Sequence, residues 1–134
     1  MKYFLLLLAS LFSNKSPAID YRSGQIWNYE NRAEDDGSRL IILKVEQDEQ
    51  FTQIVHVRLE GLRIKRMDGR TVEYIGHMPF SKQALDSSVT QLIGTESPIE
   101  EFSRAYSSWK EAKAPPMTTP VHEVVSGLAQ QLAQ

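Results

Sequence analysis

The sequence predicts an α+β domain, in which an antiparallel sheet of about four strands is followed by about three helices packed on one face. Alternating apolar and polar residues dominate the first half of the 134-residue chain, whereas apolar residues recur every three or four positions in the second half. Asp-Gly pairs, which favour tight turns, separate the strand patterns. A strongly curved or barrel-like sheet is the alternative geometry for the same strands.

Four segments carry strand patterns: residues 24–29, 39–46, 55–60 and 71–75. The first places Trp27 and Tyr29 on one face, where we expect them to join the core. The third alternates between an inward apolar set and an outward polar set, namely Val55, Val57 and Leu59 against His56, Arg58 and Glu60. Gly61 breaks that alternation, so we expect a bulge there that returns Leu62 and Ile64 to the inward face.

Three helices are expected in the second half, at residues 81–93, 97–113 and 121–132. Ser81 is placed to cap the first of these helices, and Gly94 is placed to end it. The second has proline at its start and carries an apolar stripe made of Ile99, Phe102, Tyr106 and Trp109. We expect this stripe to dock on the sheet with Trp109 largely buried. The third carries a stripe made of Val121, Val124, Val125, Leu128 and Leu132.

The first eighteen residues have the pattern of a secretory signal peptide. Lys2 precedes an apolar run, and Ser16 and Ala18 provide the small residues of a cleavage site before Ile19. The run is shorter than the roughly 20 residues that span a bilayer, so no transmembrane segment is expected in the mature chain.

This interpretation divides the chain into a signal peptide at residues 1–18 and a single α+β domain at residues 19–134, located in the periplasm or secreted. A translation start near Gly24 is the alternative and would make the protein cytoplasmic. Removal of the signal takes two of the 15 basic residues and none of the 17 acidic ones, so the net charge of −2 becomes about −4. Because this balance gives no general attraction to polyanions, we expect no nucleic acid partner.

Several classes of site are excluded or disfavoured by the residues present. The chain contains no cysteine, which excludes disulfides, thiol nucleophiles and zinc-thiolate sites. His122 and Glu123 begin a zinc-protease motif, but Ser126 stands where the second histidine is required, so we expect a polar helix face. The acidic run at residues 34–37 lacks the ligand pattern of a calcium loop and is expected to be a solvated hairpin loop. We therefore expect no cofactor and no metal site.

The order of motifs resembles a family of small uncharacterised bacterial proteins. The resemblance rests on Gly-Gln-x-Trp-x-Tyr-Glu at residues 24–30, Ser-Arg-Leu at 38–40, Gly-Leu-Arg-Ile-Lys at 61–65, Pro-Phe at 79–80 and Ala-Leu-Asp at 84–86. It would cover most of the chain from Gly24 to about Trp109. It implies a shared fold and supplies no activity.

A second resemblance, limited to residues 24–29, is to the toxin endoribonucleases built on a small SH3-like barrel. It implies RNA cleavage as an alternative activity. The acidic residues Glu34, Asp35 and Asp36 stand where those toxins carry a basic loop and an Arg-Pro pair, so the chain departs from that family's site.

Basic side chains concentrate in one part of the chain and supply the candidate binding residues Arg58, Arg63, Lys65 and Arg66. Arg63 and Lys65 alternate with Leu62 and Ile64, so the basic pair should face solvent if the apolar pair faces the core. A surface of this kind would attract an acidic protein or a small anionic ligand. The alternative is an ordinary solvated face that Glu60 and Asp68 partly neutralise.

The main functional prediction is a small, exported, non-enzymatic binding or interaction protein, with no catalytic residue assigned. The alternative is a small hydrolase that uses His56 or His77 with an acidic partner brought close by the fold. A cavity that holds a histidine and a carboxylate within hydrogen-bond reach would favour the enzyme. A flat or convex charged sheet would favour binding.

Overall fold

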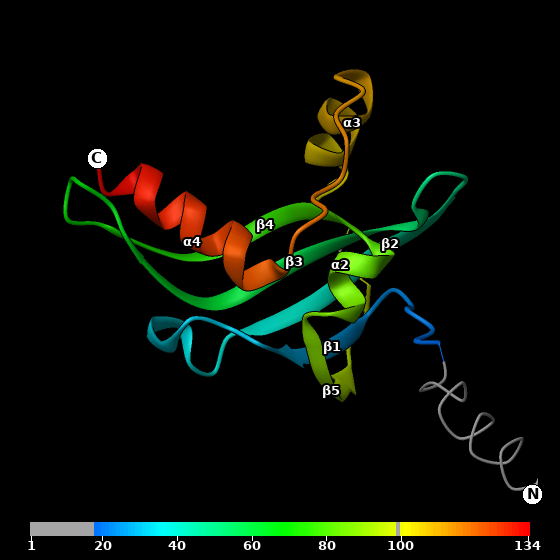
Figure 1. Cartoon of the computed structure of the whole chain (residues 1–134), viewed down its shortest axis with the longest axis horizontal. Helices are drawn as coiled ribbons and strands as arrows, with labels where there is room; N and C mark the ends of the chain where they lie inside the picture. Colours follow the sequence, from blue (N-terminus) through cyan, green and yellow to red (C-terminus); the bar gives the residue numbers. More distant parts are fainter. Residues whose placement is uncertain (1–17, 99) are drawn as a thin grey trace, which may run out of the picture.

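The computed structural model describes residues 18–98 and 100–134, which form an antiparallel sheet and three helices (Figure 1). The sheet has the order β4-β3-β2-β1-β5. Its strands are β1 (Gln25–Tyr29), β2 (Arg39–Asp48), β3 (Thr52–Lys65), β4 (Thr71–Ser81) and β5 (Val89–Thr95). The helices are α2 (Lys82–Asp86), α3 (Ser103–Glu111) and α4 (Val121–Leu132), and a 3-10 turn, η1 (Ala33–Asp35), follows β1. The α+β class is therefore confirmed. Residues 1–17, which hold nearly all of the predicted signal peptide, lie outside the described residues.

The sheet has five strands and is open, so the prediction of about four strands and the curved or barrel-like alternative are corrected. The additional strand, β5, lies in the segment for which a helix at residues 81–93 was predicted. Ser81 does cap a helix, because its hydroxyl accepts a hydrogen bond from the Ala84 N–H at 3.2 Å, but that helix ends at Asp86. Beyond it, the β-branched residues Val89, Thr90, Ile93 and Thr95 favour an extended chain, which pairs with β1.

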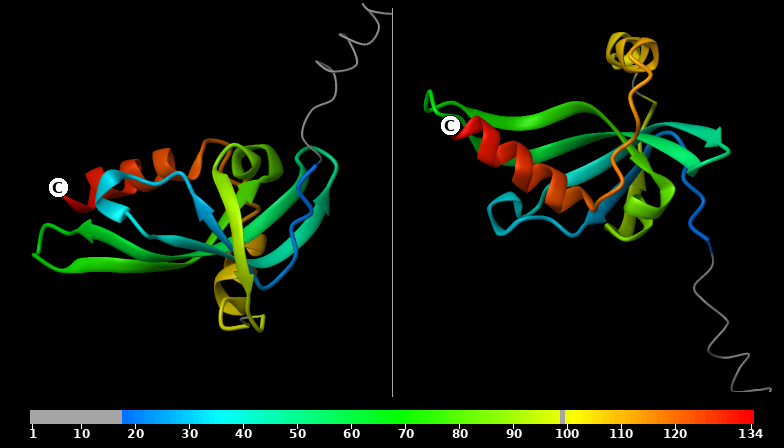
Figure 2. Two further views of the ribbon diagram at one scale, coloured as in Figure 1. Left: turned by 90° about the horizontal axis from the view of Figure 1, so that it is seen from below. Right: turned by 45° about the horizontal axis from the view of Figure 1, so that its top comes forward.

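The helices cover both faces of the sheet, which corrects the prediction that they pack on one face. The left panel of Figure 2 shows α4 and α3 on opposite sides of the strands. Residues of α2 and α4 share a buried cluster with β2, β3 and β4, whereas α3 contacts the other face of the same strands. None of the helices in the described part of the chain has the length and apolarity to cross a membrane.

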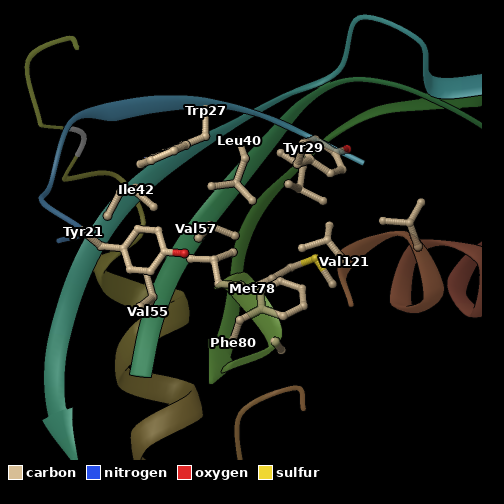
Figure 3. Packing of buried hydrophobic residues seen from close by; sticks show 14 of the residues in the cluster. Tyr21, Trp27, Tyr29, Leu40, Ile42, Val55, Val57, Met78, Phe80 and Val121 are labelled. Atoms are coloured by element: carbon tan, nitrogen blue, oxygen red, sulfur yellow. The ribbon is translucent and has the colours of Figure 1, made fainter. Parts of the chain in front are cut away.

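The main core lies between the sheet and the layer of α2 and α4 (Figure 3). Leu40 and Ile42 of β2 and Val55 and Val57 of β3 are fully buried there, and Phe80 of β4 fills the space beneath the helices. Burial of each such side chain contributes roughly 1.5–3 kcal/mol to folding. Strand β1 adds two aromatic rings to the same cluster, which confirms the predicted core role of Trp27 and Tyr29.

The predicted bulge in β3 is present at Gly61. This residue has a φ of +76°, and the register of β3 against β4 shifts between Glu60 and Ile64. Leu62 and Ile64 are consequently buried in the same cluster as Leu59. Arg63 and Lys65 are turned to the outside, as the alternation predicts.

Candidate functional site

Two of the four candidate basic side chains are engaged by neighbours on their own hairpin. The Arg58 Nε lies 3.0 Å from a Glu60 carboxylate oxygen, and its guanidinium lies 4.5 Å from the centre of the Tyr74 ring. Arg66 pairs with Asp68 at 3.3 Å in the turn that follows β3. Both side chains are therefore partly neutralised by their neighbours, and neither lines the groove that holds the other two candidates.

The other two candidates, Arg63 and Lys65, line a groove of about 480 Å³ together with Arg32, Glu34 and Ala129. We call this the basic groove. It lies between the far end of β3, the η1 turn and α4. A second hollow of about 320 Å³ runs on along α4 and shares Arg32, Glu34 and Ala129 with it. Glu34 lies 3.5 Å from Arg32, and no ion pair of Arg63 or Lys65 occurs within the described residues.

The buried carboxylate of Asp35 does not line the basic groove but holds two residues that do, Arg32 and Arg63. Its side chain is 1% exposed and accepts hydrogen bonds from Arg32 Nε at 2.6 Å and from the Arg63 backbone N–H at 2.8 Å. Arg32 Nη2 donates in turn to the Arg63 carbonyl at 3.2 Å. Strand β2 pairs with β3 only as far as Arg39 with Glu60, so the edge of β3 is open beyond that point. There the side chains of Asp35 and Arg32 bond the backbone of β3 in place of a strand. The prediction of a solvated acidic loop is wrong for Asp35.

Hydrogen bonding with Asp35 raises the pKa of Arg32 further above its ordinary value, so this guanidinium stays charged. The ion pair also fixes the planar group, because Nε and Nη2 of Arg32 each donate to a different oxygen of the carboxylate. The basic groove thus has one cation held rigidly by a buried partner and two cations, Arg63 and Lys65, on a strand whose backbone is pinned by the same carboxylate.

A second arrangement lies on the other face of the sheet, under α3, and we call it the histidine chain. It consists of Glu46 on β2, His56 on β3 and His77 on β4. His56 Nε2 lies 3.0 Å from Glu46 Oε1, and His56 Nδ1 lies 2.8 Å from His77 Nε2. The sequence predicts that His56 faces away from the main core, which it does, but its side chain is 0% exposed because α3 covers it.

The hydrogen bonds of the histidine chain determine where its protons lie. Glu46 as a carboxylate can only accept, so His56 Nε2 must carry a hydrogen and donate it. The neutral His56 ring then has a lone pair on Nδ1, and His77 must donate to it from Nε2. The nitrogen of the pair that remains free to accept a proton is therefore His77 Nδ1.

Aromatic side chains of α3 form the cover over the two imidazoles. The rings of Tyr106 and Trp109 meet His56 edge-on at centroid distances of 5.0 Å each, and Phe102 stacks on His77 at 6.2 Å. No residue of α3 is fully buried, and Trp109, which docks on the sheet as predicted, keeps part of its surface exposed. The helix is also shorter than predicted, because it begins at Ser103 and residues 100–102 are not helical. Ile99, the first residue of the predicted stripe, lies outside the described residues.

Burial and hydrogen bonding shift the pKa of all three groups in the histidine chain. Burial lowers the pKa of His56 to about 4, and the neighbouring His77 lowers it further than burial alone would. Burial also lowers the pKa of His77. Burial opposes the charged form of Glu46, yet hydrogen bonds from Tyr106 and Lys110 hold the pKa of this carboxylate below its ordinary value. At neutral pH the histidine chain therefore consists of a carboxylate, at Glu46, and two neutral imidazoles.

The histidine chain meets only part of the requirement for a hydrolase. A histidine and a carboxylate lie within hydrogen-bond reach, but His56 has no exposed surface that a substrate could touch while α3 is in place. Within the described residues, no group of three or more His, Asp or Glu side chains has the arrangement to hold a metal ion. Sequence reasoning identified both histidines and missed Glu46, although it lies on the outward face of β2 across the same hairpin.

Comparisons with protein-family models, with curated proteins and with solved structures found no match to this chain. The resemblance to small uncharacterised bacterial proteins stays a prediction. The basic groove and the histidine chain are the two features from which a function can be inferred.

Proposed function

We propose that this protein is a small, exported, non-enzymatic binding protein whose basic groove takes up an acidic segment of a partner protein. The observation that carries the proposal is the placement of Arg63 and Lys65. Both side chains are exposed, both line one groove of about 480 Å³, and neither has an ion-pair partner within the described residues. Charges of one sign that are not neutralised locally attract an opposite charge over roughly 8 Å at physiological salt.

The shape of this region favours an extended segment over a small anion. The basic groove, with Arg63 and Lys65, continues into the second hollow along α4, and Arg32 and Glu34 line both, so an extended occupant could follow the two hollows past all three cations. Ala129 contributes a small apolar wall at the point where the two hollows meet. A chain with alternating acidic and small residues fits a lining of this composition.

Export is the second part of the proposal and is supported by the signal-peptide pattern that ends at Ala18. The cysteine-free domain does not depend on disulfides, so packing alone must stabilise it in an oxidising compartment. The extensive apolar cluster between the sheet and α4 supplies that packing.

The test uses a fluorescein-labelled, glutamate-rich decapeptide and fluorescence anisotropy at low and at physiological salt. The variant is Arg63→Glu with Lys65→Glu, which reverses the two groove cations that have no ion-pair partner within the described residues. The matched control is Arg66→Glu with Arg70→Glu, which makes the same change in net charge at the nearby turn. We expect binding to weaken at least tenfold in the first double variant and less than twofold in the control.

Equal weakening in both double variants would show that only net charge matters and would overturn the groove as a specific site. Inorganic phosphate and citrate are titrated in parallel. If these small anions bind with the same dependence on Arg63 and Lys65 and the peptide does not bind, the occupant is a small anion and the proposal of an acidic segment is wrong. Circular dichroism checks that both double variants fold, which is expected because exposed charges contribute little to stability.

A further inference from the structure

We propose that the histidine chain is an acid-sensitive latch that holds α3 on the face of the sheet opposite the main core. The inference does not depend on the basic groove, which lies at the other end of β3. It rests on how α3 is attached, on the number of hydrogens that the histidine chain can hold, and on the charges around the two imidazoles.

The attachment of α3 is local and consists of side chains only. Helix α3 projects away from the sheet in Figure 1, and none of its residues is fully buried. The rings of Tyr106 and Trp109, and of Phe102 just before the helix, pack on the two imidazoles, and the Lys110 ammonium lies 3.1 Å from the second oxygen of Glu46. Apart from the Lys44 ammonium over the Tyr106 ring, these contacts with the sheet are made with members of the histidine chain, so the position of the helix depends on the geometry of the histidine chain.

The hydrogen count sets a limit on how many protons the latch can accept. A first added proton goes to His77 Nδ1, and both hydrogen bonds of the histidine chain are kept. A second proton added to the two imidazoles must go to His56 Nδ1, which then carries a hydrogen that faces the hydrogen on His77 Nε2 across 2.8 Å. Two donors at that separation cannot form a hydrogen bond, so the imidazoles must move apart. The rings on which α3 packs are the rings that move.

The charged groups around the pair act in the same direction. Glu46 is the negative group that faces His56, and it is shared with Lys110 of α3. Lys44 on β2 lies near the same site, with its ammonium 5.2 Å from the Tyr106 ring centre, and disfavours a charged His56. Two imidazolium ions would therefore meet two ammonium groups and one carboxylate, whereas the neutral pair leaves the ion pair between Glu46 and Lys110 undisturbed.

The pH range follows from the direction of the pKa shift. Burial lowers the pKa of His56 from its ordinary value of 6.5 to about 4. Between these two pH values the folded protein holds His56 neutral, whereas the same histidine in an unfolded chain would be protonated. The latch is therefore fully closed above pH 6.5, weakens as the pH falls below that value, and opens as the pH passes through about 4.

The absence of cysteine from the chain allows a direct measurement of α3 position. Spin labels are attached at Ser107→Cys on α3 and Glu73→Cys on β4, and the distance distribution is measured by pulsed electron paramagnetic resonance from about pH 7 to about pH 3.5. A control pair uses Gln130→Cys on α4 with the same β4 site. We expect the α3 distribution to broaden and shift as the pH passes through about 4 while the α4 distribution stays narrow.

The variant His77→Gln separates the latch from general acid sensitivity. A glutamine amide can donate to neutral His56 from its nitrogen, and can accept from protonated His56 through its oxygen after a flip. We therefore expect α3 to stay docked in this variant at pH values where it is released in the original chain. His122→Gln, a change at the remaining histidine of the chain, should leave the release unchanged.

Three results would overturn the proposal. The first is an α3 distance that does not change although nuclear magnetic resonance shows both imidazoles protonated. The second is release of α3 in His77→Gln at the same pH as in the original chain. The third is simultaneous broadening of the α4 control pair, which would show that the domain unfolds as a whole and has no separate latch.

Discussion

Replacement of Asp35 by alanine should destabilise the protein far more than its place in an acidic surface loop suggests. The carboxylate is 1% exposed and accepts from Arg32 Nε at 2.6 Å, from Arg32 Nη2 at 3.0 Å and from the Arg63 N–H at 2.8 Å. Its loss leaves a guanidinium whose side chain is only 12% exposed without its main partner, and it leaves an N–H on the edge of β3 without an acceptor.

The magnitude follows from those two consequences. Removal of one partner from a buried, hydrogen-bonded charge pair costs about 3–5 kcal/mol, of which the orphaned backbone N–H accounts for about 1–3 kcal/mol. We expect about 3 kcal/mol for Asp35→Ala, at the low end because Arg32 can turn toward water and toward Glu34. Asp35→Asn should lose less, about 2 kcal/mol, because its amide oxygen can still accept from Arg63.

The assay is urea unfolding followed by circular dichroism at neutral pH, with Asp36→Ala as the matched control. Asp36 is the next residue in the same loop and is exposed, so its substitution should change the free energy of unfolding by less than about 0.5 kcal/mol. A result in which the Asp35 and Asp36 variants differ by less than about 1 kcal/mol would refute the reasoning, because it would show that the pairing on the edge of β3 contributes little.

Three further outcomes follow from the same structure. Trp109→Ala should lower the free energy of unfolding by about 1–2 kcal/mol and Phe80→Ala by about 3–5 kcal/mol, because Trp109 is only partly buried whereas Phe80 is fully buried. Thermal unfolding of the two variants checks this order. Gly61→Ala should cost about 1–3 kcal/mol, since the residue has a φ of +76° and a new Cβ would lie 3.2 Å from the Ser38 Cα; urea unfolding measures it, and an unchanged midpoint would contradict the bulge. Mass spectrometry of the native protein should find Ile19 at the N-terminus, and an intact Met1 in an exported fraction would contradict the proposed cleavage after Ala18.

The elements that the sequence predicts correctly are those in which local pattern and tertiary position agree. The alternation of β3, its break at Gly61 and the apolar stripe of α4 each require one buried face, and each is found against the same core. The segment after Ser81 is different, because its cap and its apolar spacing at Leu85, Val89 and Leu92 suit a helix as well as a strand. Pairing with β1 decides between them, and a partner strand more than fifty residues away is not visible in a local pattern.

The candidate site shows the same division. The exposure of Arg63 and Lys65 follows from strand parity, so it could be predicted. The pairing of Arg58 with Glu60 and of Arg66 with Asp68 could also be predicted, because each carboxylate lies two residues further along the chain. The stacking of Arg58 on Tyr74 could not, because it depends on how β4 lies beside β3. Asp35 was misplaced for a similar reason: an acidic loop is usually solvated, and only the open edge of β3 supplies the groups that bury this carboxylate.

An outward position on a strand means only that the residue does not face the main core, and the histidine chain shows why that differs from facing water. His56 is outward by parity and is fully buried because α3 covers that face. The sequence carries a signal for this cover: the stripe of α3 is made of aromatic rings, Phe102, Tyr106 and Trp109, where the stripe of α4 is aliphatic. Aliphatic side chains suit an apolar strand face, whereas aromatic edges and faces also pack favourably on imidazole rings. A helix with an aromatic stripe and a strand face that carries histidine are therefore complementary, and their presence in one chain predicts a second, smaller packing layer on the opposite side of the sheet.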